Sequence, residues 1–168
     1  MKTKLLLFTV LAAFTLTVHA QSMEARDEKP FKIGVGALIG LPVGDYSDIT
    51  SLAWGIDLMG EYAVAPEFGL TLSAGYLDWA KKSGFSGLKL GFIPVLVGAK
   101  YYFTDQLYGS GQVGISFSTQ SGGGSAFTYA PGIGYKISDN FDLLLKFQSA
   151  TKDGVSTSFI GIRAGLSF

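Results

Sequence analysis

Apolar side chains occupy every second position along most of the chain after residue 30. In residues 31–41 the odd-numbered positions are Phe, Ile, Val, Ala, Ile and Leu, while the even-numbered ones are Lys, Gly, Gly, Leu and Gly. A period of two places alternate side chains on opposite faces of a β-strand. The segment therefore predicts a strand with one apolar face and one face of small or charged residues.

The same alternation recurs to the end of the chain and predicts an even number of strands. Eight segments show it: 31–41, 54–62, 70–76, 93–103, 107–117, 127–136, 141–148 and 159–168. The connections expected to be tight are 65–67, 104–106 and 138–140, and those expected to be longer are 42–52, 78–87, 119–125 and 150–155. Short turns at one end and longer loops at the other are typical of outer-membrane barrels. We predict an all-β fold, an eight-stranded antiparallel up-and-down transmembrane β-barrel whose longer loops face outward.

Composition supports strands in lipid. Hydrophobic residues make up 48% of the chain and charged residues only 15%, with 23 glycines. Aromatic residues stand near strand ends on the apolar face, as interfacial girdles would. The alternative is a soluble, lipocalin-like ligand-binding barrel, in which the apolar face would point inward. In such a barrel the other face of the strands would be exposed to water. That face is rich in glycine and poor in charge, which does not suit a soluble surface and favours the membrane interpretation.

The first twenty residues have the pattern of a secretory signal peptide. Lys2 and Lys4 give a positive start, residues 5–16 are apolar, and Val18-His19-Ala20 forms a small-residue cleavage pattern. We expect export through the Sec pathway, cleavage near Ala20, a short periplasmic lead-in over 21–30 and a barrel over 31–168 in the cell outer membrane.

Three segments carry a resemblance to a known family. They are 93–103 (IPVLVGAKYYF), 129–135 (YAPGIGY) and 159–168 (FIGIRAGLSF). The chain resembles the small OmpA/OmpX-like outer-membrane β-barrels, described as the outer membrane protein beta-barrel domain. The resemblance implies that the terminal Phe168 is an assembly signal read by the barrel-insertion machinery, and that the partners are outer-membrane lipid and that machinery. We also expect a monomer.

Two prolines and one change of parity depart from the regular pattern. Pro94 and Pro131 fall inside expected strands, where each removes a hydrogen-bond donor of the ladder, so we expect a bulge or local bend. The apolar face also changes parity between 88–92 and 93–95, which a bulge would explain.

Little in the chain suggests catalysis or nucleic-acid binding. The only histidine, His19, would leave with the signal peptide, there is no cysteine, and the carboxylates lack metal-ligand spacing. The formal net charge is zero, which gives no basic surface for nucleic acid. We expect no enzyme activity, no cofactor and no bound metal.

Charged residues of inward parity form the candidate site. They are Lys32, Asp57, Glu61, Lys100, Lys136, Asp142, Lys146 and Arg163. Side chains nearly fill an eight-stranded barrel, and an unpaired buried ion costs several kcal/mol, so we expect these charges to pair. Strand direction predicts an Asp57–Arg163 pair, with Gly34 and Gly36 leaving room, and places Lys136 beside Asp142.

Two functions in the membrane remain open. The first is a non-enzymatic barrel with a structural or surface-interaction role, whose most contact-capable loop residues are Tyr46, Trp79, Lys81, Lys82 and Phe85. The second is a small transport or lipid-binding barrel, in which apolar residues of inward parity line an acyl-sized pocket. These residues are Leu38, Met59, Leu96, Leu144 and Phe159. The volume of the lumen separates the two functions.

Overall fold

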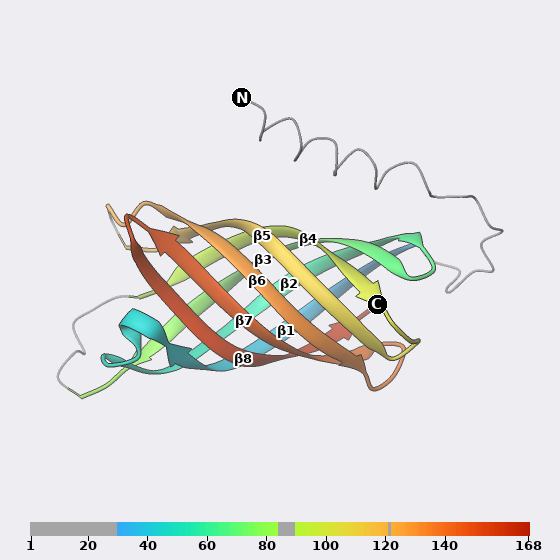
Figure 1. Ribbon diagram of the computed structural model, residues 1–168, viewed down its shortest axis with the longest axis horizontal. Coiled ribbons are helices and arrows are strands. Elements are labelled where there is room, and N and C mark those ends of the chain that lie inside the picture. Colours follow the sequence, from blue (N-terminus) through green and yellow to red (C-terminus); the bar gives the residue numbers. More distant parts are fainter. Residues whose placement is uncertain (1–29, 84–89, 121) are drawn as a thin grey trace, which may run out of the picture.

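The strands close into a single barrel. The structure, a computed structural model, describes residues 30–83, 90–120 and 122–168. Eight strands, each antiparallel to its neighbours in sequence, form one closed sheet in the order β1 to β8, and β1 pairs with β8 (Figure 1). The predicted eight-stranded up-and-down architecture is confirmed. No helix in the described part of the chain is long and apolar enough to cross a membrane.

All strands except β4 are longer than the alternation alone predicted. Their bounds are β1 Phe31–Val43, β2 Thr50–Ala65, β3 Phe68–Lys81, β4 Phe92–Tyr102, β5 Leu107–Ser118, β6 Ser125–Lys136, β7 Phe141–Lys152 and β8 Val155–Ser167. A single 3-10 turn, η1, covers Gly44–Tyr46 between β1 and β2. The largest extensions are at the start of β2, the end of β3 and both strands of the last hairpin. There the hydrogen-bonded ladders continue beyond the segments in which apolar residues alternate.

The two ends of the barrel differ. One end carries the start of β1, Phe168 and the connections 66–67, 103–106 and 137–140, and is called here the C-terminal end. The other, the loop end, carries residues 44–49, the end of β3, the start of β4 and the described residues 119–120 and 122–124 (Figure 1). The loop predicted over 150–155 is wrong in length. Only Asp153 and Gly154 connect β7 to β8, and both have positive φ, so a tight turn lets the ladder run to Lys152 and Val155.

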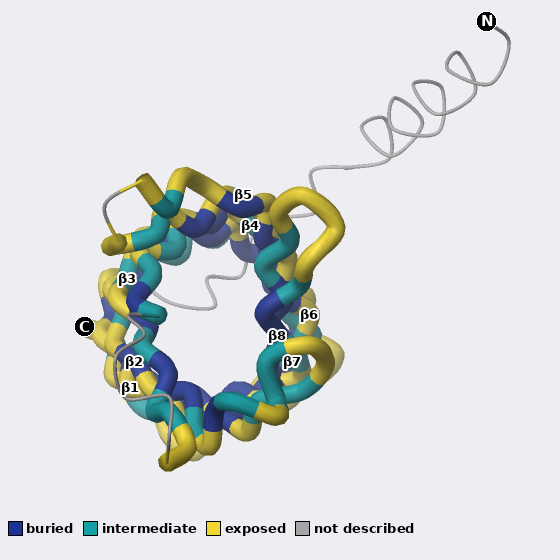
Figure 2. Tube along the Cα trace, turned by 90° about the vertical axis from the view of Figure 1, so that its left-hand side faces the viewer, coloured by how far each residue is buried: buried dark blue, intermediate teal, exposed yellow. Residues whose placement is uncertain are grey.

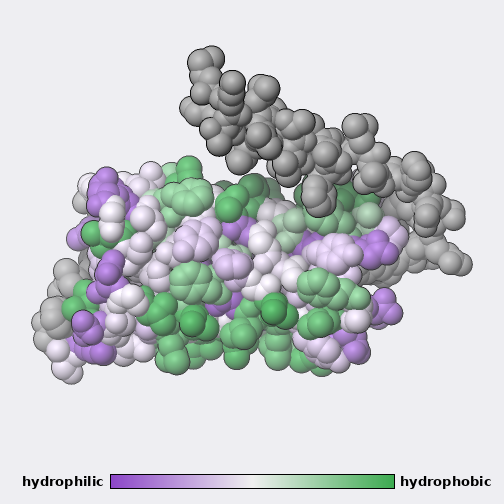
Figure 3. Space-filling model, in the orientation of Figure 1, coloured by the Kyte–Doolittle hydropathy of each residue, from purple (hydrophilic) through white to green (hydrophobic). Residues whose placement is uncertain are grey.

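The apolar face points outward all round the barrel. Ile56 and Leu58 of β2 are 62% and 59% exposed, whereas their neighbours in sequence face inward. Viewed along the barrel, buried and exposed residues alternate around a closed ring (Figure 2), and hydrophobic residues cover most of its visible middle (Figure 3). A soluble barrel would need the reverse arrangement, so the lipocalin-like alternative is wrong.

Aromatic side chains border this apolar surface at both ends. At the C-terminal end Phe31 lies opposite Tyr62, and at the loop end Trp54 packs edge-on against Tyr76 with ring centroids 6.2 Å apart. A rise of about 3.3 Å per residue and a tilt of about 40° put Trp54 and Tyr62 about 20 Å apart along the barrel axis. This separation matches the apolar band of a transmembrane barrel, which is about 25 Å tall.

Neither internal proline creates a bulge. The β3–β4 ladder is interrupted at Gly75 and Tyr76, on either side of which the register is unchanged, and Pro94 lies opposite this gap. The β6–β7 ladder has a similar gap at Pro131 with its register kept. The parity change before residue 93 falls partly on residues outside the described ranges, but Phe92 packs against the luminal apolar cluster, so its apolar side chain faces inward without a bulge.

Candidate functional site in the barrel lumen

Asp57 and Arg163 form the central ion pair of the lumen. Arg163 of β8 is only 2% exposed, and its Nε donates to both carboxylate oxygens of Asp57 on β2, at 2.9 and 2.8 Å. Its Nη2 donates to Asp57 Oδ1 at 2.6 Å. The pair expected from strand direction is therefore present, in a two-pronged geometry that fixes both side chains.

Glycines on the lumen wall make room for the guanidinium. Asp57 lies opposite Gly36 of β1, which in turn lies opposite Gly165 of β8, so the pair reaches across β1. A Cβ atom at Gly36 would lie 2.5 Å from the Arg163 guanidinium, and one at Gly165 would lie 2.5 Å from Asp142 Oδ1. Arg163 Nη1 also lies 3.9 Å from that Asp142 oxygen. One buried arginine thus ties β8 to β2 and to β7.

Tyr108 extends the network to the opposite wall. Its hydroxyl donates a short hydrogen bond to Asp142 of β7, and its ring lies where a Cβ of Gly134 on β6 would stand. The register places Lys136 beside Asp142, as expected, but the ammonium of Lys136 is 3.9 Å from the exposed Asp139 of the adjacent turn. Asp142 is instead occupied by Tyr108 and Arg163.

Glu61 joins β2 to β4 nearer the C-terminal end. Lys100 Nζ donates to Glu61 Oε2 at 2.9 Å, and the Tyr102 hydroxyl donates to Glu61 Oε1 at 2.7 Å. The Glu61 carboxylate lies over Gly69 of the intervening strand, 2.7 Å from where a Cβ would be. Lys100 Nζ also stands 4.7 Å from the centre of the Tyr108 ring, a cation–π contact that joins the two halves of the network.

A fourth tie consists of neutral groups. Gln112 Nε2 of β5 lies 3.1 Å from Ser73 Oγ and 3.4 Å from Thr71 Oγ1, both on β3. Gln112 lies opposite Gly98 of β4, and Gly98 lies opposite Thr71. In each of the four ties a side chain passes over a glycine on the strand between its partners. Together the ties form a belt that joins β2–β4, β3–β5, β5–β7 and β8–β2.

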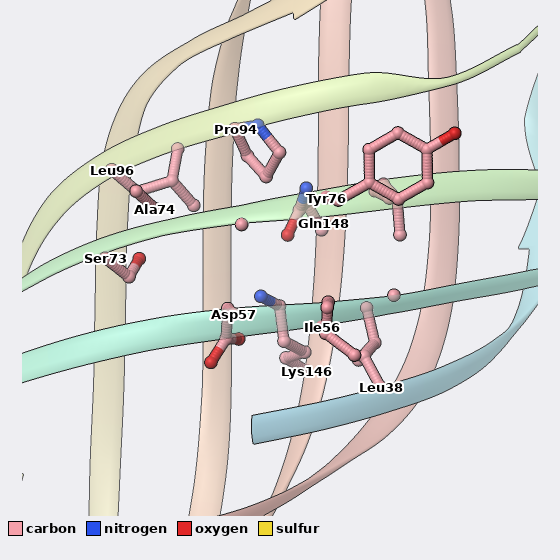
Figure 4. Close-up of a pocket in the computed structure, with 13 residues that line it drawn as sticks. Leu38, Ile56, Asp57, Ser73, Ala74, Tyr76, Pro94, Leu96, Lys146 and Gln148 are labelled. Atoms are coloured by element: carbon pink, nitrogen blue, oxygen red, sulfur yellow. The ribbon is translucent and has the colours of Figure 1, made fainter. Parts of the chain in front are cut away.

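Lys146 differs from the other luminal cations. It is 6% exposed, yet within the described ranges its ammonium forms no ion pair or hydrogen bond. It lines a cavity of about 20 Å³ together with Asp57, Ser73, Pro94 and Gln148 (Figure 4). Such a volume holds about one water molecule, so the acyl-sized pocket proposed for Leu38 and Leu96, which also line it, does not form there.

An apolar cluster occupies the lumen nearer the loop end. Its buried members are Ala53, Leu77, Trp79 and Phe159, and Leu38, Leu90 and Phe92 pack against them. Trp79 is 1% exposed and meets Phe159 edge-on at 5.7 Å. The prediction of Trp79 as a surface loop residue is therefore wrong, because β3 continues to Lys81 and odd positions beyond Leu77 keep facing inward. Phe85 lies outside the described residues.

The comparisons with known proteins agree with this geometry. The family model described as the outer membrane protein beta-barrel domain matches residues 8–168. The chain belongs to this family. Its resemblance to small outer-membrane barrels is thereby confirmed, and membership supports an outer-membrane location. No curated protein matches the chain.

Solved structures show the same fold at low sequence identity. The attachment invasion locus protein Ail of Yersinia pestis aligns with TM-score 0.57 and 17% identity over 82% of this chain and 97% of Ail. The N-terminal barrel of Pseudomonas aeruginosa OprF gives 0.56 and 12% over 82% and 97%. A de novo designed transmembrane β-barrel gives 0.56 and 18% over 84% and 99%. The similarity to a designed barrel indicates that the fold alone does not specify a function.

The predicted candidates of this outer-membrane barrel fall into two groups. Asp57, Glu61, Lys100, Asp142 and Arg163 meet in the belt, whereas Lys136 contacts the rim and Lys146 lines the cavity. Tyr102, Tyr108 and Gln112 also belong to the belt, although they were not among the predicted candidate residues. Their signal was inward parity, since polar side chains on the inner face of a packed barrel need partners.

The described residues include the terminal Phe168 but no cluster of metal-binding side chains. They contain no cluster of three or more His, Cys, Asp or Glu side chains that could hold a metal ion. Phe168 lies at the C-terminal end, where its backbone pairs with Ile33 of β1 and its side chain is 67% exposed. Its backbone therefore extends the pairing between β8 and β1, and its side chain faces outward.

Proposed function

We propose that this protein is a non-enzymatic, non-conducting outer-membrane barrel with a structural or surface-interaction role. The observation that carries the proposal is the belt of four side-chain ties that cross the lumen. Arg163, Lys100, Tyr108 and Gln112 are each 6% exposed or less. A conducting pore would need its charged groups to face water, whereas here the charged groups of the belt bind one another.

Two further features support a structural role. The apolar cluster around Trp79 and Phe159 fills part of the lumen on the loop side of the belt, and the cavity beside Lys146 holds about one water molecule. At the loop end Asp45 accepts the Ser156 amide at 3.1 Å, and Lys82 Nζ donates to the Ser47 carbonyl at 3.0 Å. These bonds hold the loop between β1 and β2 against the barrel rim as a fixed surface.

Planar-bilayer recording of the refolded full barrel tests the proposal. We expect no discrete current steps from the wild-type protein. The variant D57A/R163A removes the central ion pair and the volume of its two side chains. It is a control protein with a widened lumen and should show more current than the wild type. Steps of steady size from the wild type, unchanged in D57A/R163A, would refute the closed lumen.

We also propose the export and assembly route that the sequence suggests. Residues 1–20 act as a Sec signal peptide removed near Ala20, and Phe168 is read by the barrel-insertion machinery. The finished barrel is a monomer in outer-membrane lipid. N-terminal sequencing of the protein from isolated outer membranes tests the cleavage, and F168A should lower the amount of inserted barrel if the terminal aromatic residue is the signal.

A further inference from the structure

Lys146 is a buried cation whose local partner is missing. The carboxylate that lines the same cavity, Asp57, already accepts three hydrogen bonds from Arg163. Among the described residues no atom accepts a hydrogen bond from the Lys146 ammonium, although the residue is only 6% exposed. A buried ammonium without a hydrogen-bond acceptor is costly, so a mobile acceptor is required.

The pairing of the barrel wall across the cavity is also interrupted. Pairing between β3 and β4 stops after Ala74↔Val95 and resumes at Leu77↔Phe92, so Gly75 faces Pro94 without a ladder partner. A proline has no amide hydrogen and offers nothing to a carbonyl on the neighbouring strand. Gly75 is only partly exposed, and a backbone carbonyl that loses its ladder donor is normally satisfied by another group or by water.

The two deficits meet in one cavity. Lys146, Gly75 and Pro94 all line the space of about 20 Å³, together with the polar side chains of Ser73 and Gln148. Figure 4 shows the Lys146 ammonium directed toward Asp57 and the wall formed by β2 and β3. A cavity of this size with two to four polar partners meets the requirements for one buried water molecule.

We propose that the lumen contains a specific site for one water molecule, which accepts a hydrogen bond from the Lys146 ammonium and donates to the β3 backbone opposite Pro94. Water fits better than a small anion because the Asp57 carboxylate lines the same space and would repel an anion. The water compensates both the lysine of β7 and the interrupted β3–β4 ladder, and so explains how Lys146 and Pro94 can line one cavity.

Direct observation tests the site in the intact barrel. A crystal structure at a resolution that shows ordered solvent, or water–protein NOE spectra of the barrel in micelles, should detect one long-lived water within hydrogen-bond reach of Lys146 Nζ and of a β3 carbonyl. The K146M variant should lose this water. P94V restores an amide donor to the ladder, so the residue-94 amide should become protected from exchange and the water should weaken or leave.

The second proline provides the matched control. Pro131 stands in the similar gap of the β6–β7 ladder but does not line the cavity, so P131V should leave the water in place. A direct Lys146–Asp57 contact with no water in the cavity would overturn the proposal. A water that persists unchanged in both K146M and P94V would overturn it as well. Because the wild-type observation needs no variant, the test does not depend on how well each variant folds.

Discussion

The Asp57–Arg163 pair allows a quantitative prediction about stability. Replacing Arg163 by Met keeps much of the side-chain volume but leaves Asp57 without its three hydrogen bonds and Asp142 without a neighbouring cation. Removing one partner of a buried pair costs about 3–5 kcal/mol. The Asp57 side chain is 18% exposed, so water recovers part of the loss. We expect about 3 kcal/mol, or roughly a hundredfold change in the unfolding equilibrium constant.

Equilibrium unfolding in urea, with the barrel refolded into lipid vesicles, measures this effect. Trp54 lies on the lipid face and Trp79 in the lumen, so tryptophan fluorescence reports on both sides of the wall. A double-mutant cycle with D57N isolates the pair itself. R163M leaves the Asp57 carboxylate without a cationic partner, and D57N removes that unpaired charge. The double variant should therefore be more stable than the sum of the single losses predicts, by about 1 kcal/mol or more.

A rim ion pair gives the control. Lys136 lies 3.9 Å from Asp139, whose side chain is 91% exposed, and such surface pairs contribute about 0–1 kcal/mol. K136M should therefore change stability far less than R163M. Equal losses in R163M and K136M, or a coupling between positions 57 and 163 indistinguishable from zero, would show that the buried pair does not hold the belt together.

Two further substitutions test how the ties depend on their surroundings, in the same unfolding assay. G36A places a Cβ against the luminal guanidinium and should cost about 1–3 kcal/mol, whereas G111A, with nothing within 4 Å of the new atom, should be nearly neutral; equal effects would contradict the steric argument. Y108F removes the hydrogen bond to Asp142 and should cost about 1–3 kcal/mol, while Y135F loses only an exposed bond and serves as its control. A loss no larger in Y108F than in Y135F would argue against that tie.

The alternation of side chains was sufficient to predict the fold and the faces of the strands. A period of two separates the faces without reference to partners, and even the Asp57–Arg163 pair follows, since both residues have inward parity at similar depth. Trp79 was predicted to lie in a loop, although the same alternation extends to it. Continuing the parity of β3 past Leu77 would have placed the indole in the lumen.

The partners of the lysines could not be predicted in this way. Parity and strand direction give the face and the approximate depth of a residue, and so placed Lys136 beside Asp142, but they do not give the direction in which a long side chain extends. In the structure Lys100 binds Glu61, Lys136 contacts the rim and Lys146 lines the cavity. The length of the last loop was missed for a different reason. Asp153-Gly154 is a recognisable tight-turn dipeptide, but its polar flanks resembled loop sequence.

The luminal glycines explain what composition alone could not. Inward glycines at 36, 69, 98 and 134 each lie beneath a side chain that joins the strands on either side. A tie across one strand is possible only where that strand carries no side chain at the same level. The belt therefore requires glycine and a long polar residue on neighbouring strands in register. The combination of a glycine and a long polar residue can be recognised in the sequence once the register is known. It predicts which strands are tied together better than the positions of the charges alone.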